Sequence, residues 1–318
     1  MAMQISGVTI QGGMNILPAG GSSPSPSPTP SGASNGYFAG GLTDAGVSTI
    51  QSFSFSSDGN ASNVGNLSRA VYAGTGQSSS SSGYASGGYS TLFETTIDKW
   101  PFASNGTASD VGDLTVARSV PAGQSSSDNG YSSGGAPSYN TIDKFPFSSD
   151  GNATDVGDLT QNTGYAAGQN SSSHGYVSGG HVNSPTSRIE KFSFASDGNG
   201  STVGDLTAAK RGNDNGQSSS DNGYHSGGLT APSLSWLNVI EKFPFSSDSN
   251  ASDIGDLTVG RADAAGSYSS GSGYLAGGIT SPTDLSNVID KFPFSSDSDA
   301  TDVGDLTVAI RFGSGNQG

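Results

Sequence analysis

One short motif, Gly-Tyr-x-x-Gly-Gly, occurs six times in the chain, and this internal repeat limits the fold more than any other feature. The motif tyrosines are Tyr37, Tyr84, Tyr131, Tyr176, Tyr224 and Tyr274. Intervals in the high forties are typical of β-propeller blades built from four strands. Only 31% of the residues are hydrophobic, which is also typical of disorder. The regular spacing of the apolar residues favours a repeated folded unit instead.

The third copy of the repeat divides into four strand-sized segments. The four predicted strands are 121–127, 131–135, 142–147 and 153–159. Asn129-Gly130 predicts a tight hairpin before the second strand, because both residue types tolerate positive φ. Asp150-Gly151 predicts a similar turn between the third and fourth strands.

The two ends of the repeat array complement each other. The first copy starts at its second strand, residues 37–41, whereas residues 310–316 have the pattern of a first strand. We therefore expect the C-terminal strand to complete the N-terminal blade and close the ring, leaving no large exposed sheet edge. The predicted fold is an all-β, six-bladed propeller spanning residues 35–318, with four antiparallel strands per blade.

This repeat resembles the kelch family of β-propellers. The matching features are the glycine pair, the tyrosine three positions before it, an aromatic residue on the third strand and an arginine before the first strand. Residues that occupy or approach this arginine position are Arg69, Arg118, Arg211, Arg261 and Arg311, with Thr163 in one copy. The family's usual tryptophan near the blade end is absent, and Phe-Pro-Phe stands on the third strand instead. The resemblance implies a four-stranded blade.

The first 34 residues differ from the repeats. Residues 1–20 form a predicted docking arm, with Ile5, Val8 and Ile10 as candidate strand positions. Residues 21–34 are rich in Ser-Pro, which favours extended polyproline II and predicts a semi-rigid spacer. A disordered tail is the alternative.

The start MAMQISGVTI resembles the N-termini of virion structural proteins of tailed bacteriophages, especially cyanophages. This resemblance implies that the arm docks on other virion proteins, that the protein is located in the virion, and that several copies occur per particle. The N-terminus has no basic segment followed by a long apolar run, so we expect no signal peptide.

Charge and composition argue against several classes of partner. The net charge of −15 disfavours nucleic acid and anionic membranes, and no stretch approaches 18 apolar residues. The absence of cysteine excludes disulfides, thiolate metal sites and cysteine nucleophiles.

The aspartates come as repeated Asp-x-x-Asp pairs. Paired carboxylates can act as general acid and base, but a catalytic pair is expected once rather than in four copies. Capping of turns is the favoured interpretation. Residues 150–158 place oxygen atoms at intervals that a calcium ion could use, yet they lack the EF-hand spacing. We therefore predict no catalytic residue, metal or cofactor.

Recognition is expected in the segments that join the second strand to the third, which vary most between copies. These segments are 42–49, 89–96, 136–141, 181–188, 229–239 and 279–288. In a propeller they emerge on one face together with the connections between blades. The candidate ligand-binding residues are Tyr89, Phe93, Tyr139, His181, Arg188, Trp236 and Leu237. Unconstrained loop variation is the alternative. Trp100 replaces a phenylalanine of Phe-Pro-Phe and is expected in the core.

These observations predict a non-enzymatic virion-associated protein, of tail-fibre, fibre-tip or decoration type, that presents a propeller to a host-surface glycan or to a neighbouring virion protein. A decoration protein without a ligand is one alternative. A polysaccharide-degrading propeller enzyme is another, and it requires a unique pair of carboxylates in the central pocket. A cellular kelch-type scaffold is a third.

Overall fold

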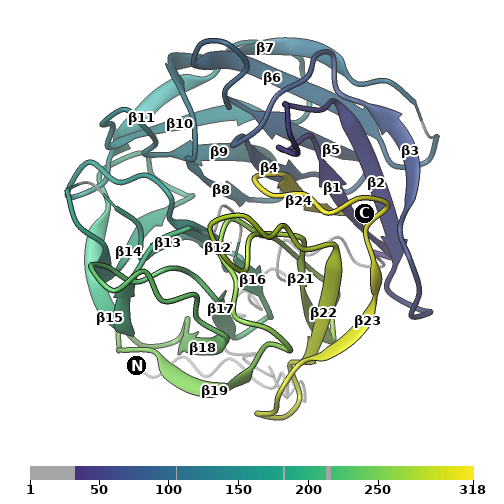
Figure 1. Ribbon diagram of the computed structural model, residues 1–318. Helices are drawn as coiled ribbons and strands as arrows, with labels where there is room; N and C mark the ends of the chain where they lie inside the picture. The colour runs from purple at the N-terminus through teal and green to yellow at the C-terminus, as the bar shows by residue number, and fades with distance from the viewer. Residues whose placement is uncertain (1–32, 105, 182, 213–215) are drawn as a thin grey trace, which may run out of the picture.

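The structure is a computed structural model, and it describes residues 33–104, 106–181, 183–212 and 216–318. These residues form six four-stranded antiparallel sheets around a central axis (Figure 1). The predicted six-bladed propeller is confirmed. None of the described residues forms a helix of the length and apolarity needed to cross a membrane. The predicted docking arm, including Ile5, Val8 and Ile10, lies outside the described residues.

Each blade runs from an inner strand at the axis to an outer strand at the rim. Blade A contains β24 (Ser314–Gln317), β1 (Asn35–Ala39), β2 (Thr49–Ser54) and β3 (Ser62–Asn66). Blade B contains β4 (Thr75–Ser78), β5 (Ser82–Ser86), β6 (Glu94–Pro101) and β7 (Ser109–Arg118). Blade C contains β8 (Ala122–Ser125), β9 (Asn129–Ser133), β10 (Thr141–Pro146) and β11 (Thr154–Asp158).

The remaining three blades follow the same order. Blade D contains β12 (Ala167–Asn170), β13 (His174–Ser178), β14 (Thr186–Ser193) and β15 (Ser201–Lys210). Blade E contains β16 (Gln217–Ser218), β17 (Asn222–Ser226), β18 (Val239–Pro244) and β19 (Ser252–Asp256). Blade F contains β20 (Ala265–Tyr268), β21 (Ser272–Ala276), β22 (Val288–Pro293) and β23 (Thr301–Asp305).

The ring closes as the sequence predicts. The C-terminal strand β24 pairs antiparallel with β1, with Tyr37 opposite Asn316. The backbone N–H groups of Ser34 and Asn35 both donate to the carbonyl oxygen of Gly318 at 2.8 Å. The two ends of the described chain therefore lie side by side at the start of β1.

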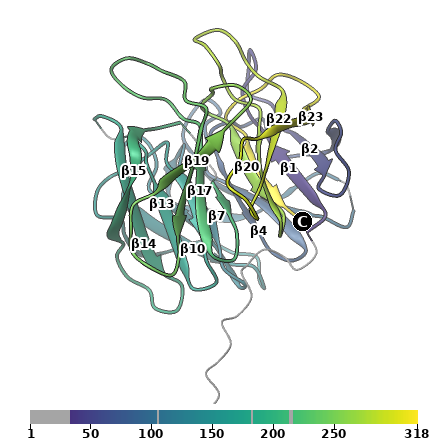
Figure 2. The same ribbon diagram turned by 90° about the horizontal axis from the view of Figure 1, so that it is seen from below.

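The propeller has two different faces. The variable loops and the connections between blades lie on one of them, which we call the mouth face, and a β-bridge joins the two kinds of segment in every blade. These bridges are Leu42–Arg311, Tyr72–Tyr89, Ser119–Ala136, Gly164–His181, Arg211–Leu229 and Ala262–Ile279. The hairpins that join the first strand to the second and the third to the fourth lie on the opposite face (Figure 2). The direction of β1 and β24 places Ser34 and Gly318 on that opposite face as well.

The apolar core is divided into six small clusters, each shared by two adjacent blades. In each cluster the motif tyrosine of one blade stacks on the phenylalanine that lies two positions after the buried aromatic residue of the third strand in the next blade. Tyr131, for example, stacks on Phe194 with ring centroids 4.7 Å apart. Trp100 is 2% exposed, which confirms its predicted place in the core. Six small clusters explain how a chain with few hydrophobic residues can fold.

The prediction of a hairpin turn at Asn129-Gly130 is wrong, because both residues belong to β9. The turn precedes them, and the N–H of Ser126 donates to the carbonyl oxygen of Asn129 at 2.9 Å. Glycine is required at 130 for a different reason: a Cβ there would lie 2.4 Å from Cζ of Phe145. The Asn-Gly pair therefore marks close packing of Gly130 against the ring of Phe145 and not a turn.

Buried amides link the inner strand of one blade to the second strand of the next. One glutamine on each of β4, β8, β12 and β16 donates from Nε2 to the carbonyl oxygen of the motif tyrosine in the next blade at 2.9–3.0 Å. The residues are Gln77, Gln124, Gln169 and Gln217. In blade A, Asn316 Nδ2 donates to the carbonyl oxygen of Tyr84 at 2.9 Å. The inner strands therefore supply a polar core that the apolar pattern of the sequence does not indicate.

The predicted arginine position needs correction. The cations that precede the inner strands and are fully buried are Arg118, Lys210 and Arg261, which pair with Asp143, Glu241 and Asp290. Arg211 and Arg311 come one residue after this position and lie on the mouth face. Burial without a partner would be very costly for such charges, which explains why each cation has an acidic partner.

The Asp-rich hairpins hold adjacent blades together on the opposite face. Asp150 pairs with Lys99 at 2.8 Å, and Asn152 Oδ1 accepts a hydrogen bond from the N–H of Asp113 at 3.0 Å. Asp155 Oδ1 accepts from the N–H of Gly157 at 3.1 Å. These oxygens therefore have separate protein partners, as the capping interpretation predicts.

Candidate functional site

The central channel is closed by close contacts between the inner strands. A Cβ on Gly76 would lie 2.0 Å from the carbonyl oxygen of Gly315, so these strands approach as closely as glycine allows. Asn170 Nδ2 of blade D donates to the hydroxyl of Tyr268 of blade F at 3.0 Å. The cavity remaining at the axis has a volume of about 10 Å³, room for about one water molecule. A ligand can bind at the mouth of the channel, but it cannot enter the channel.

Six residues form a closed ring of backbone hydrogen bonds at this mouth, and we call them the mouth ring. Each residue donates its N–H to the carbonyl oxygen of the ring residue in the preceding connection. The six residues are Ala73, Val120, Tyr165, Gly212, Asp263 and Phe312. All six have positive φ, between 48° and 93°. The conformation is unfavourable for residues other than glycine, yet five of the six carry a side chain.

Six aromatic side chains form a continuous arc over the mouth. In spatial order they are Phe93, Tyr89, Tyr72, Phe312, Tyr165 and His181. Neighbouring ring centroids are 5.4–6.5 Å apart. All six are at least partly exposed, and Phe93 is 37% exposed. Partly exposed rings of this kind can stack on a sugar or anchor a partner side chain.

Two arginines and one aspartate lie within this arc. The guanidinium of Arg211 lies 5.3 Å from the ring centroid of Tyr165, and that of Arg311 lies 4.9 Å from the centroid of Phe312. Arg311 Nη1 is 3.4 Å from Asp263 Oδ2. Burial raises the pKa of Asp263 to about 7, although both arginines act to lower it. Burial, with a smaller contribution from Arg211, lowers the pKa of His181.

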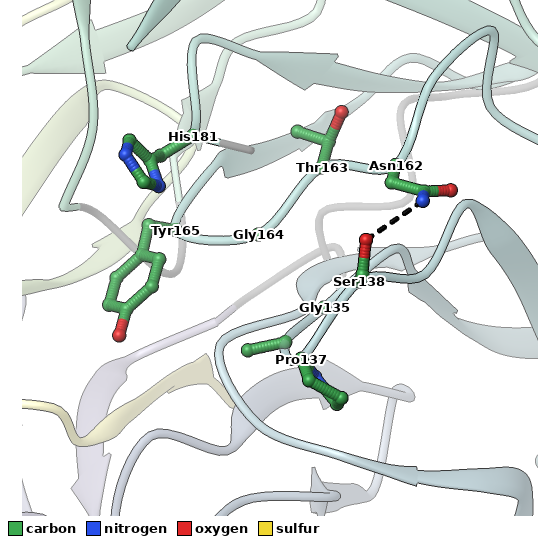
Figure 3. Close-up of a pocket in the computed structure, with 9 residues that line it drawn as sticks. Gly135, Pro137, Ser138, Asn162, Thr163, Gly164, Tyr165 and His181 are labelled. Atoms are coloured by element: carbon green, nitrogen blue, oxygen red, sulfur yellow. Dashed lines mark hydrogen bonds between the residues drawn. The ribbon is translucent and has the colours of Figure 1, made fainter. Parts of the chain in front are cut away.

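A small pocket of about 50 Å³ lies beside Tyr165 (Figure 3). It is lined by residues 135–138 and 162–165 and by His181. Asn162 Nδ2 donates to the hydroxyl of Ser138 at 2.8 Å at its edge. Ligand sites for whole small molecules are several times larger, so this pocket can take a substituent of a ligand rather than the ligand itself.

The structure brings together three of the seven predicted site residues, since Tyr89, Phe93 and His181 belong to the aromatic arc. Tyr139 is partly buried, and its backbone links Gly135 and Thr163 through hydrogen bonds of 2.9 Å. Arg188 lies 2.5 Å from Glu190 in an ion pair, with only 12% of its side chain exposed.

Trp236 and Leu237 lie together in the longest variable loop, in blade E. Both are partly buried, and Trp236 forms a β-bridge with Leu229 of the same loop. These two residues are outside the aromatic arc, so the structure does not join them to the other predicted residues.

Sequence reasoning missed half of the arc and all of its charged residues, because these lie in the connections between blades. The missed residues are Tyr72, Tyr165, Arg211, Asp263, Arg311 and Phe312. A signal for the mouth ring exists. Every ring residue is the sixth after the leucine of the repeated Gly-Asp/Asn-Leu sequence, as Phe312 follows Leu306. This position carries six different residue types in six otherwise similar repeats.

These observations define the protein as a six-bladed β-propeller with a closed channel and an aromatic mouth face. No protein-family model matches the chain, and no significant match is found among curated proteins. Because one propeller scaffold can support many functions, its function has to be argued from the mouth face itself.

Proposed function

We propose that this protein is a non-enzymatic adhesive or structural component of a tailed-phage virion, and that it binds a host-surface glycan or another virion protein through its mouth face. The observation that carries the binding part is the continuous aromatic arc over a channel that no ligand can enter. Aromatic side chains beside hydroxyl and amide groups suit the stacking and hydrogen bonding that sugars require.

The position of the chain ends supports an outward-facing mouth. Ser34 lies on the opposite face, so the chain preceding it joins the propeller on the side away from the arc. A docking arm formed by residues 1–20 would then present the mouth face to the surroundings of the particle. The virion assignment rests on the resemblance of the N-terminus.

Two comparisons test the two parts of this proposal. Cryo-EM of particles that carry the full chain, compared with particles whose copy lacks residues 1–33, tests the docking arm. We expect propeller density to disappear in the second sample. Density that persists would assign docking to the blades.

Binding of the full chain to an array of host-type glycans and to purified virion proteins tests the mouth face. We expect the double substitution Tyr72→Ser with Phe312→Ser to lower binding about tenfold or more, because it removes the centre of the arc. Full binding by this variant would assign recognition to another surface. Attachment to the particle without any ligand would support the decoration alternative.

A further inference from the structure

The distribution of basic residues singles out one position. All 12 lysines and arginines lie among the described residues, and eleven of them form ion pairs within the propeller. Arg211 forms no ion pair with any described residue. Its partly exposed side chain lies over the ring of Tyr165 on the mouth face. In a chain with a net charge of −15, a partly exposed guanidinium on the mouth face is the feature best suited to an external anion.

A second guanidinium supports the first at the same place. Arg311 stacks on Phe312, whose ring centroid lies 6.3 Å from that of Tyr165, so the two arginine–aromatic pairs adjoin. The ion pair of Arg311 with Asp263 is long, at 3.4 Å. A planar guanidinium packed on an aromatic ring is well suited to bidentate recognition of a carboxylate.

The backbone of the mouth ring is an independent observation. Tyr165, Asp263 and Phe312 have φ values of 56–58°, a conformation that glycine adopts without steric cost. These residues therefore hold their side chains at the axis at an energetic cost, which is typical of functional sites. The three side chains are the ones that contact or flank the two arginines.

We infer that the mouth face binds an acidic saccharide, with the carboxylate of a uronate-type sugar paired to Arg211 and the sugar ring stacked on Tyr165 and Phe312. This inference rests on the proposed glycan-binding function and names the class of glycan. A saccharide fits better than an acidic peptide, because the pocket beside Tyr165 is small and offers both polar side chains, Ser138 and Asn162, and apolar ones, Ala136 and Pro137. Such a mixed pocket accommodates an acetamido group, which has a polar amide and an apolar methyl.

Calorimetry with the full chain tests the inference. The probes are oligosaccharides of polygalacturonate, alginate and hyaluronan, each compared with its carboxyl-reduced form. We expect at least one acidic form to bind about tenfold more tightly than its reduced form. Arg211→Gln should weaken binding of that acidic form about tenfold and leave the reduced form nearly unchanged. Lys144→Gln is the matched control, since it removes the same charge on the opposite face and should bind as the wild type does.

The remaining outcomes separate the inference from the proposed function. Equal binding of acidic and reduced forms would overturn the inference and leave glycan binding intact. No binding of any saccharide by a folded propeller would overturn the inference together with the glycan part of the proposed function, and would leave binding to a virion protein as the remaining part. Binding of poly-glutamate that Arg211→Gln abolishes, with no saccharide bound, would show that the anionic ligand is a peptide and that the saccharide class is wrong.

Discussion

Asp263 and Arg311 face each other across the channel mouth at 3.4 Å, yet burial holds the pKa of Asp263 at about 7, far above its ordinary value of 3.8. Between about pH 4 and 7 the folded protein therefore keeps a proton that the unfolded chain has released. This group makes the free energy of unfolding fall as pH rises through that window, by up to about 1.4 kcal/mol per pH unit.

Asp263→Asn removes this titration. Between pH 5 and 7 we expect the free energy of unfolding of the wild type to fall relative to that of the variant. Above pH 8 we expect the two plots of unfolding free energy against pH to run parallel. Urea denaturation at a series of pH values measures the difference. Parallel curves across the whole range would contradict the raised pKa.

The same carboxyl group should control anion binding. Two cations face Asp263, Arg311 at 3.4 Å and Arg211 through its longer-range charge. Protonation removes a competing negative charge, so affinity for an acidic oligosaccharide should rise several-fold as pH falls from 8 to 6. Asp263→Asn should bind tightly and independently of pH over this range. A wild-type affinity that falls on acidification would contradict the prediction.

The buried ion pairs predict a compensating double substitution. Lys210 pairs with Glu241 between blades D and E, whereas the corresponding residues at blade A are Ile310 and Gln51. The oxygen of Gln51 accepts hydrogen bonds from Thr307 N–H and Oγ1 at 2.6 and 2.8 Å, just as Glu241 accepts from Thr207.

Lys210→Ile alone should therefore cost about 3–5 kcal/mol, because Glu241 keeps an unpaired buried charge. Adding Glu241→Gln should recover most of that loss. A double-mutant cycle measured by urea denaturation checks both values. If the losses of stability from the two substitutions simply added, the Ile310–Gln51 pair could not replace the Lys210–Glu241 pair at the interface between blades D and E.

The amide links between blades predict a polar contribution to stability. Gln124 donates to the carbonyl oxygen of Tyr176 at 3.0 Å and accepts from the hydroxyl of Ser133 at 2.9 Å. Gln124→Ala leaves both buried groups without this partner, so a loss of about 2–4 kcal/mol is expected in chemical denaturation. Gln161→Ala, at an exposed side chain, should change stability by less than about 0.5 kcal/mol. Equal effects at the two sites would refute this assignment.

Two glycines of the same blade give a matched test of packing. A Cβ at Gly130 would lie 2.4 Å from the ring of Phe145, whereas a Cβ at Gly151 meets no atom within 4 Å. Gly130→Ala should destabilise the protein by about 1–3 kcal/mol. Gly151→Ala should be close to neutral. If Gly130→Ala proved no more harmful than Gly151→Ala, the packing interpretation of Gly130 would be contradicted.

Much of the fold could be predicted from the sequence because the repeat samples one pattern six times. The spacing of Tyr131 and its five counterparts defined the blades, and the complementary chain ends predicted the pairing of β24 with β1. The variable loops, and with them Tyr89, Phe93 and His181, could be assigned to one face because propeller topology alternates loops and hairpins between faces.

The mouth ring, and which arginines and lysines are buried in ion pairs, could be learned only from the tertiary structure. Tyr165, Asp263 and Phe312 are separated by 49 residues or more, and they adjoin only because the ring closes. Arg118 and Arg211 occur in similar sequence contexts, but their positions in the repeat differ by one residue. Arg118 is therefore buried in an ion pair, whereas Arg211 lies over the ring of Tyr165. The repeated pattern alone determined the scaffold, because the spacing of buried residues within one repeat specifies the strands of one blade. The arrangement of the site was decided by contacts between blades, because these join residues whose sequence separation carries no information about distance.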